Sequence, residues 1–271
     1  MANKESISYL NYLIRTYKSL TDMMAATKNR LQSLPGDHPV KFDKILHGEE
    51  KEEGLETIKG RISRLIGKEL PNWDVWECWL KNVPGIGNVT AAELIMLYYY
   101  KYIPVCKDCV TVLEKKDGTY WCSGCEKSVK GEGNLDYLLG DKDFATISKW
   151  WAYMGRDIKD GAMRKRKRGE QLNWSPNGRR LGFMIGESFN KQQPDHKYKA
   201  VLLAEKAKYE KSQPDISKGW RHNKAKNNAV KLFLAHFWTV CRTLDKKPVS
   251  DPYAMVIMGH TNYIKPFYFD E

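Results

Sequence analysis

Apolar residues recur at helical spacing over residues 4–34, and the pattern ends at Pro35. A second amphipathic helix is predicted to begin at Leu55 and to end before Pro71. The charged stretch between the two helices has little hydrophobic pattern and is predicted to be a loop. Residues 1–71 are therefore expected to form a helical hairpin or coiled-coil arm, which would serve in packing or in self-association.

Residues 72–104 combine aromatic and glycine signals. Tryptophans at helical spacing predict a helix over residues 72–83, before the turn that contains PGIG, and a second, apolar helix is predicted from Val89 to about Tyr102. This order is typical of a helix-hairpin-helix, in which two glycines let the backbone approach a phosphate and the N–H groups of the second helix receive it. The residues expected to contact phosphate are Gly85, Gly87, Asn88 and Thr90. An ordinary Gly-Pro helix break is the alternative, and the tryptophans (Trp73, Trp76 and Trp79) are expected in the core.

Four cysteines form two Cys-x-x-Cys pairs separated by twelve residues, namely Cys106, Cys109, Cys122 and Cys125. Such spacing can present four thiolates tetrahedrally to one ion, and the intervening residues read as a β-hairpin around Asp117 and Gly118. Residues 105–130 are therefore predicted to be a zinc ribbon with a structural Zn²⁺, and a catalytic zinc is not expected. The remaining Cys78 and Cys241 are expected to be buried apolar residues.

Residues 131–271 are predicted to be mainly helical. Helices are expected at 143–155, 181–189, 197–211 and 220–244, with a glycine-containing basic loop at 156–180. His236 lies on the apolar side of the last helix and is expected to be a core histidine rather than a catalyst. The predicted fold is thus mainly α, with a helical arm, a helix-hairpin-helix domain and a small inserted β zinc ribbon.

The charge of the chain indicates an anionic partner. The net charge is +12, and the surplus lies in residues 156–180, at +6, and 197–231, at +7. Polyanion binding is therefore expected in the C-terminal half, with solvated helix faces as the alternative. The cations expected to contact nucleic acid are Arg164, Lys165, Arg166, Lys167, Arg168, Arg179, Arg180, Arg221, Lys224 and Lys226. No apolar run approaches the length of a membrane span and no secretory signal is visible, so a cytoplasmic or nucleoid-associated protein is expected, and no membrane partner.

Three segments in order resemble a known family. VPGIGNVTAA at 83–92, then Phe144 followed by WWAYMG at 150–155, then NGRR at 177–180, resemble the C-terminal transposase domain of insertion-sequence-110-type transposases. The resemblance spans about residues 72–244. It implies DNA recombination, in some members guided by a structured RNA, by a catalytic serine working with a RuvC-like nuclease domain that carries four acidic residues.

The sequence departs from that family at the chemistry. The stretch before residue 72 is too short for a RuvC-like domain, and the zinc ribbon is an insertion. The position of the family's nucleophile holds Asp160, and a carboxylate cannot form a phosphoserine link to DNA. Ser148 and Ser175 are the nearest hydroxyls, and neither fits the pattern well.

These observations favour a nucleic-acid-binding protein that has lost the catalytic serine. DNA is the expected ligand, including branched or transposon-end DNA, and structured RNA is an alternative. The second hypothesis is an active recombinase or nuclease. Its nucleophile would be Ser175 or Ser148, or paired aspartates would bind catalytic metal ions. A homo-oligomer formed through the N-terminal helices is expected, and an interaction protein with an incidental basic surface is the third hypothesis.

Overall fold

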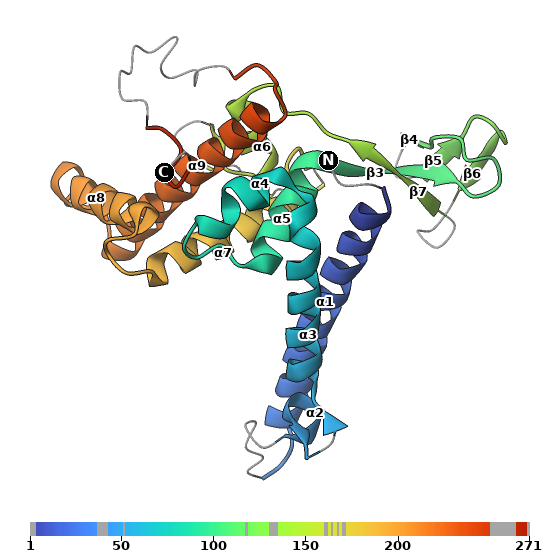
Figure 1. The fold of residues 1–271 in the computed structure, drawn as a ribbon, viewed down its shortest axis with the longest axis horizontal. Helices are drawn as coiled ribbons and strands as arrows, with labels where there is room; N and C mark the ends of the chain where they lie inside the picture. The colour runs from blue at the N-terminus through green and yellow to red at the C-terminus, as the bar shows by residue number, and fades with distance from the viewer. Residues whose placement is uncertain are drawn as a thin grey trace. The chain divides into compact units, whose positions relative to one another are not determined.

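A computed structural model describes residues 4–36, 43–50, 52–116, 119–129, 135–159, 162–163, 165–166, 168–169, 172–249 and 264–269. As predicted, the fold is mainly helical with small sheets (Figure 1). The chain divides into two compact units. We call residues 1–94 with 145–271 the body, and residues 95–144 the ribbon.

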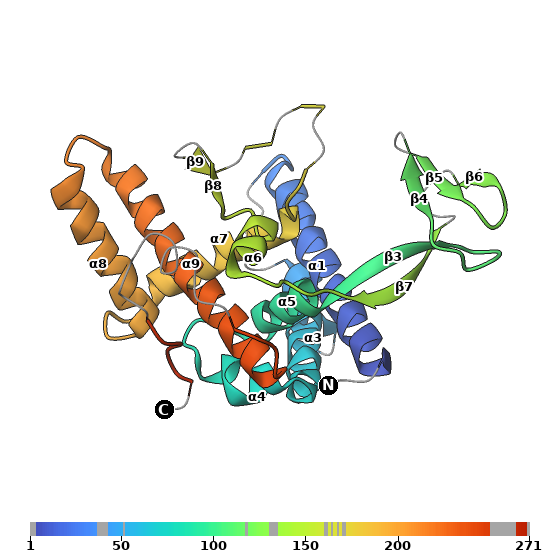
Figure 2. The same cartoon turned by 90° about the horizontal axis from the view of Figure 1, so that it is seen from above.

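Two helices of the body form the predicted arm. α1 (Lys4–Gln32) and α3 (Leu55–Glu69) lie side by side, as both cartoon views show (Figures 1 and 2). The predicted loop between them contains short structured pieces instead: α2 (Lys44–His47), β1 (Gly48–Glu49) and β2 (Glu52–Glu53), with β1 antiparallel to β2. Asp43 stabilises the start of α2, because its carboxylate accepts a 2.9 Å bond from the backbone N–H of Leu46.

The tryptophan-rich segment is broken where one helix was predicted. It consists of two 3₁₀ turns, η2 (Leu70–Asn72) and η3 (Leu80–Asn82), on either side of α4 (Asp74–Cys78). The break lies at Trp79, whose backbone (φ −147°, ψ −62°) is not helical. Its fully buried ring stacks on Phe233 with ring centroids 5.6 Å apart, so tertiary packing decides this backbone.

The remaining helices of the body surround an aromatic core. They are α6 (Ile147–Tyr153), α7 (Pro176–Lys191), α8 (Lys197–Ser212) and α9 (Lys218–Leu244), and α8 lies along α9 (Figures 1 and 2). A short hairpin, β8 (Ile158–Lys159) with β9 (Ala162–Met163), lies between α6 and α7 in the sequence. The largest fully buried side chains of the core include Trp79, Trp150, Trp238, Tyr198, Phe189, Phe233 and Phe237.

Residues 264–269 pack onto this core through backbone and ring contacts. Trp79 donates its indole N–H to the carbonyl of Phe267 at 2.6 Å, and the N–H of Lys197 donates to the hydroxyl of Tyr268 at 2.9 Å. His236 is buried as predicted: its Nδ1 lies 2.8 Å from the hydroxyl of Tyr198, and its Nε2 lies 3.0 Å from the carbonyl of Ile264. The carbonyl can only accept, so Nε2 carries the proton and Nδ1 accepts from Tyr198.

The ribbon contains the end of α5 (Asn88–Tyr99) and two sheets. β3 (Tyr100–Cys106) pairs antiparallel with β7 (Leu135–Asp141), and β4 (Glu114–Lys116), β5 (Thr119–Cys122) and β6 (Lys127–Val129) form a three-stranded sheet in that order. The predicted hairpin is present as the β4–β5 pair, while its two central residues lie outside the described part. The β3–β7 pairing was not predicted, because YYYKYIP continues the apolar pattern of α5 without a turn signal. Among the described residues, no helix has the length and apolar content needed to cross a bilayer.

Candidate metal centre and nucleic-acid interface

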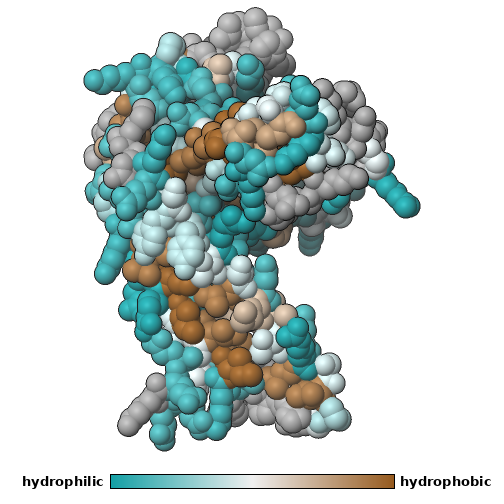
Figure 3. Space-filling model, turned by 90° about the vertical axis from the view of Figure 1, so that its right-hand side faces the viewer, coloured by the Kyte–Doolittle hydropathy of each residue, from teal (hydrophilic) through white to brown (hydrophobic). Residues whose placement is uncertain are grey.

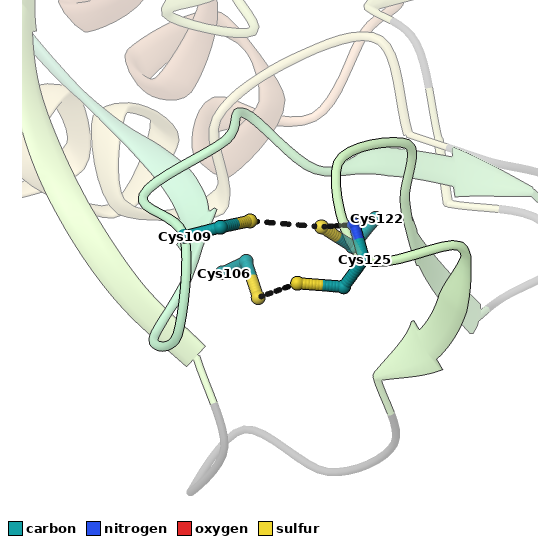
Figure 4. Close-up of side chains that lie close together, drawn as sticks. All are labelled: Cys106, Cys109, Cys122 and Cys125. Atoms are coloured by element: carbon teal, nitrogen blue, oxygen red, sulfur yellow. Dashed lines mark hydrogen bonds between the residues drawn. The ribbon is translucent and has the colours of Figure 1, made fainter.

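The four cysteines of the two Cys-x-x-Cys pairs meet in the ribbon, where their sulfur atoms all lie within 4.8 Å of one another (Figure 4). The Sγ atoms of Cys106 and Cys125 are 3.8 Å apart, and those of Cys109 and Cys122 are 3.4 Å apart. These distances are far above the roughly 2.05 Å of a disulfide. A tetrahedral ion with metal–sulfur bonds of about 2.3 Å would separate its sulfur ligands by about 3.8 Å. The four cysteines could therefore hold a metal ion.

Each Cys-x-x-Cys pair lies on a tight turn of the same design. The residue after its second cysteine, Val110 in one turn and Glu126 in the other, has a positive φ (59° and 51°). A β-branched residue rarely adopts this backbone, so Val110 is strained. The turn that requires this strain brings Cys106 and Cys109 into the four-cysteine cluster. In the second turn the N–H of Cys125 donates to the sulfur of Cys122 at 3.3 Å. A Cβ at Gly124 would lie 2.5 Å from the Thr111 hydroxyl oxygen and 3.1 Å from the Cys109 sulfur, so the turn requires glycine.

The thiols of the cluster are not equivalent. Hydrogen bonds from Thr111 lower the pKa of Cys109 to about 6. The pKa of Cys125 is raised to about 12 by its hydrogen bond with Cys109 and by burial. Burial raises the pKa of Cys122 as well. A bound cation would supply the positive charge needed to ionise all four thiols together.

Two of these cysteines belong to a small buried hydrophobic cluster of the ribbon. Cys106 and Cys122 are buried together with Leu113, Val129 and Leu135. So small a cluster of apolar side chains buries little area, and the two cysteines supply part of it. Of the two other cysteines, Cys241 is buried as predicted, but Cys78 is exposed, because it ends the short α4 rather than continuing a long apolar helix.

The predicted phosphate-binding turn lies in the body, beside α7. Gly85 has φ +90°, and its carbonyl accepts a 2.6 Å bond from the hydroxyl of Ser188. Gly87 is exposed, and a Cβ there would meet nothing within 4 Å. The amide of Asn88 donates to the carbonyl of Ser63 at 3.3 Å, so this side chain holds the turn against α3 rather than pointing into solvent. Thr90 is half-buried in the first turn of α5.

The basic loop contains exposed cations. Lys165, Arg166 and Arg168 are exposed, and none of them forms an ion pair within the described part of the chain. Two further predicted cations of this loop, Arg164 and Lys167, and the candidate Asp160 lie outside the described residues.

Two arginines predicted in the basic loop lie within α7 instead, because the helix already begins at Pro176, and they point in different directions. The guanidinium of Arg179 lies 4.8 Å from the ring centre of Trp174, whereas Arg180 donates to the carboxylate of Glu93 at 2.7 Å. Glu93 is only 4% exposed and also binds Lys18 at 3.1 Å. This buried carboxylate joins α1, α5 and α7. The sequence analysis did not select Glu93, although a single acidic residue within an apolar helix could have indicated a buried ion pair.

The predicted cations of α9 are also engaged. Arg221 lies 3.7 Å from Glu210, Lys224 bonds to Gln213 and lies over Tyr209, and Lys226 forms an ion pair with Glu187. Carboxylates therefore partly balance the charges of Arg221 and Lys226, whereas Gln213 and Tyr209 contact Lys224 without neutralising it.

The serine candidates occupy ordinary helical positions. Ser175 is the N-cap of α7, where its hydroxyl accepts a 3.0 Å bond from the N–H of Gly178. Ser148 is exposed in the first turn of α6. The hydroxyl of Ser175 thus caps a helix, a role that serines also have outside active sites, so this contact does not identify Ser175 as a nucleophile.

Arg156 is a buried cation that sequence reasoning did not single out beyond its charge. It is 6% exposed and donates to the Asn227 side chain at 2.8 Å and to the carbonyl of Arg179 at 3.1 Å. Burial, and secondly the charge of Arg179, lower the pKa of Arg156 to about 10. Gly182 leaves room for its guanidinium, because a Cβ there would lie 2.7 Å from Nη2. Arg156 therefore connects α6, α7 and α9 and positions the start of the basic loop.

Comparisons of this chain with protein-family models, with curated proteins and with solved structures found no match.

Proposed function

We propose that this protein binds nucleic acid, with DNA as the main ligand, through the basic surface of the body. The supporting observation is the set of exposed cations on the loop that leads into α7, Lys165, Arg166 and Arg168, which form no ion pair within the described residues. Such cations can neutralise phosphates and release counterions, which is the main source of affinity in non-specific binding.

The uneven distribution of charge also supports this proposal. The ribbon has seven lysines and eight acidic residues, so its −1 leaves +13 for the body. The exposed Gly87 and the positive φ of Gly85 suit the predicted helix-hairpin-helix, whose N–H groups would add phosphate contacts. The resemblance to insertion-sequence-110-type transposase domains points to DNA in the same way.

The test is a titration of duplex DNA binding against salt. The logarithm of the binding constant should fall linearly with the logarithm of the salt concentration, by about 0.9 for each phosphate neutralised. Changing Lys165, Arg166 and Arg168 together to Gln should reduce that slope by about 3. The matched control changes three exposed cations of α1, Arg15, Lys28 and Arg30, to Gln. A binding constant that does not depend on salt would refute the proposal, and tighter binding of structured RNA than of DNA would refute the DNA assignment.

We propose further that the cysteine cluster holds one structural Zn²⁺. Four thiolates with a closed tetrahedral arrangement are a common ligand set for structural zinc, and the sulfur separations fit its bond lengths. Metal analysis of the purified protein should find about one zinc per chain, and Cys109→Ser should abolish it. An iron–sulfur cluster, which also binds four cysteines, would show visible absorption and iron instead.

The arm supports self-association as a second property. The buried residues of α1 all lie in its first half (Ile7, Leu10, Leu13 and Ile14), while Met23, Leu34 and Ile45 are at least half exposed. Figure 3 shows hydrophobic side chains along the arm, in the lower part of the view. A second copy of the arm would cover them.

Sedimentation equilibrium tests this assembly. We expect a dimer, and Met23→Lys with Leu34→Lys should convert it to a monomer that is still helical. A wild-type monomer at micromolar concentration would refute self-association through the arm without affecting the binding of nucleic acid.

A further inference from the structure

We propose that the exposed face of α7, together with the basic side chains beside it on α8 and α9, binds a single strand of DNA by stacking a base on Phe183. This inference rests on the proposed nucleic-acid binding and narrows its ligand to an unpaired strand.

One stripe of α7 faces solvent. Its residues follow the i, i+3, i+4, i+7 and i+11 spacing of a helix face and are Arg180, Phe183, Met184, Glu187 and Lys191. Phe183 is 55% exposed and Met184 is 42% exposed, so two large apolar side chains lie uncovered in the middle of the stripe. The opposite side of α7 is fully apolar and packs in the core.

A cation lies against each of these two side chains: Lys226 of α9 at Phe183, and Arg180 of α7 itself at Met184. The amine of Lys226, on α9, lies 4.8 Å from the ring centre of Phe183 and pairs with Glu187. His222 lies one turn before Lys226 on the same face of α9. Burial lowers the pKa of His222, and so do the charges of Lys226, Lys206 and Lys199.

The acidic residues of this surface do not balance its cations. Glu187 is engaged by Lys226, and the buried Glu93 is engaged by Lys18 and Arg180. Lys18 and Arg180 bind Glu93, and the charges of Lys226 and Lys191 act on Glu187, so four cations act on these two carboxylates. The excess favours an anionic partner.

The exposed ring distinguishes a single strand from a duplex. In a duplex the faces of the bases are covered by their neighbours, and a protein surface meets phosphates and groove edges. An unpaired base offers its face, and stacking on an aromatic side chain among cations is how single strands are bound without sequence preference. Phe183 is exposed on α7 with the amine of Lys226 over its ring, which offers this combination, whereas lysines alone would serve a duplex equally well.

The first experiment compares a fluorescent oligo(dT) with a duplex of equal length in anisotropy titrations. Phe183→Ala should weaken oligo(dT) binding about ten-fold and leave duplex binding within about two-fold. Phe183→Trp should bind oligo(dT) as tightly as the wild-type protein, because tryptophan keeps an aromatic face. The matched control is Tyr137→Ala, an aromatic residue of the ribbon that is 47% exposed, which should leave both affinities unchanged.

A second variant should increase affinity, which damage to the fold could not do. Glu187→Gln removes the carboxylate that engages Lys226, so oligo(dT) binding should become about three-fold tighter at low salt. Since Glu187 is on the surface, the helical circular dichroism should not change.

The outcomes separate this inference from the proposed function. If wild-type protein binds duplex DNA and Phe183→Ala weakens neither ligand, or weakens both equally, the single-strand assignment is wrong and the proposed function stands. Tighter binding of oligo(U) than of oligo(dT) would overturn DNA as the strand. If wild-type protein binds none of these ligands at low salt, the proposed function itself fails.

Discussion

The body and the ribbon are stabilised by different means. The body buries a core of tryptophan, phenylalanine and tyrosine side chains, several of them with no exposed surface, among its helices. Around its cysteines the ribbon has a small separate cluster of three buried aliphatic residues, Leu113, Val129 and Leu135, with Cys106 and Cys122. A large buried apolar area can stabilise a unit by itself, whereas a small domain with little of it is often stabilised by a cross-link or a metal. One chain thus combines a unit with a large aromatic core and a unit whose small core includes cysteines of a four-cysteine cluster.

Removal of metal should have the largest effect, and only on the ribbon. Structural zinc contributes about 10–16 kcal/mol to the folding of small domains, so Cys122→Ser or a strong chelator should unfold residues 95–144. Hydrogen exchange should show lost protection in the ribbon and unchanged protection in α7 and α9. The control is Cys78→Ser, an exposed cysteine outside the cluster. If the ribbon stays protected without metal, its apolar core is sufficient and the contrast with the body disappears.

A cavity in the aromatic core should produce the opposite pattern. Phe233 has no exposed surface and contacts the rings of Trp79, Phe189 and Tyr198. Phe233→Ala should lower the free energy of unfolding of the body by about 3–5 kcal/mol, measured by urea denaturation. Metal content should not change. Loss of metal in this variant would show that the two units do not fold independently.

Acid should destabilise the body through His236. Burial lowers the pKa of this histidine to about 4, although the carbonyl of Ile264 favours the charged ring. The unfolded chain, with a pKa of about 6.5, takes up the proton first, so stability is complete above about pH 6.5 and falls as the pH drops toward 4. The loss should reach about 3 kcal/mol, one pKa unit being about 1.4 kcal/mol.

The measurement is the urea midpoint of the body as a function of pH. His236→Gln cannot titrate, so the part of the pH dependence due to this residue should vanish, while the variant is less stable at pH 7. The same slope in both proteins would mean that other groups cause the acid sensitivity.

The smallest effect is expected at Ser175. Its hydroxyl caps α7, so Ser175→Ala should cost about 1 kcal/mol of body stability. Affinity for DNA should stay within about two-fold, because the exposed cations of the basic loop and Phe183 are unchanged. A covalent protein–DNA adduct that forms in the wild-type protein and is absent from Ser175→Ala would make the chain an active recombinase instead.

Local patterns in the sequence were sufficient where a structure depends on neighbours in the chain. The arm helices, α7 to α9 and the β4–β5 hairpin lie close to where their periodicity predicted them. Local patterns were insufficient where a structure depends on contacts between residues far apart in the sequence. The predicted helix through Trp79 is broken because its ring packs against α9, and the strand that begins at Tyr100 forms because Leu135–Asp141 pairs with it. Neither partner can be identified from the local pattern.

The candidate sites divide in the same way. The sequence by itself determined the sulfur ligand set, because two Cys-x-x-Cys turns need only a hairpin between them to meet, and it determined that positive charge lies in the C-terminal half. Only the tertiary structure decided which cations remain available. Glu93 and Glu187 are distant in sequence from Lys18 and Lys226, and folding brings each carboxylate to its cation. Exposure likewise depends on how helices pack, which is why Phe183, within an apolar helical pattern, lies on the surface.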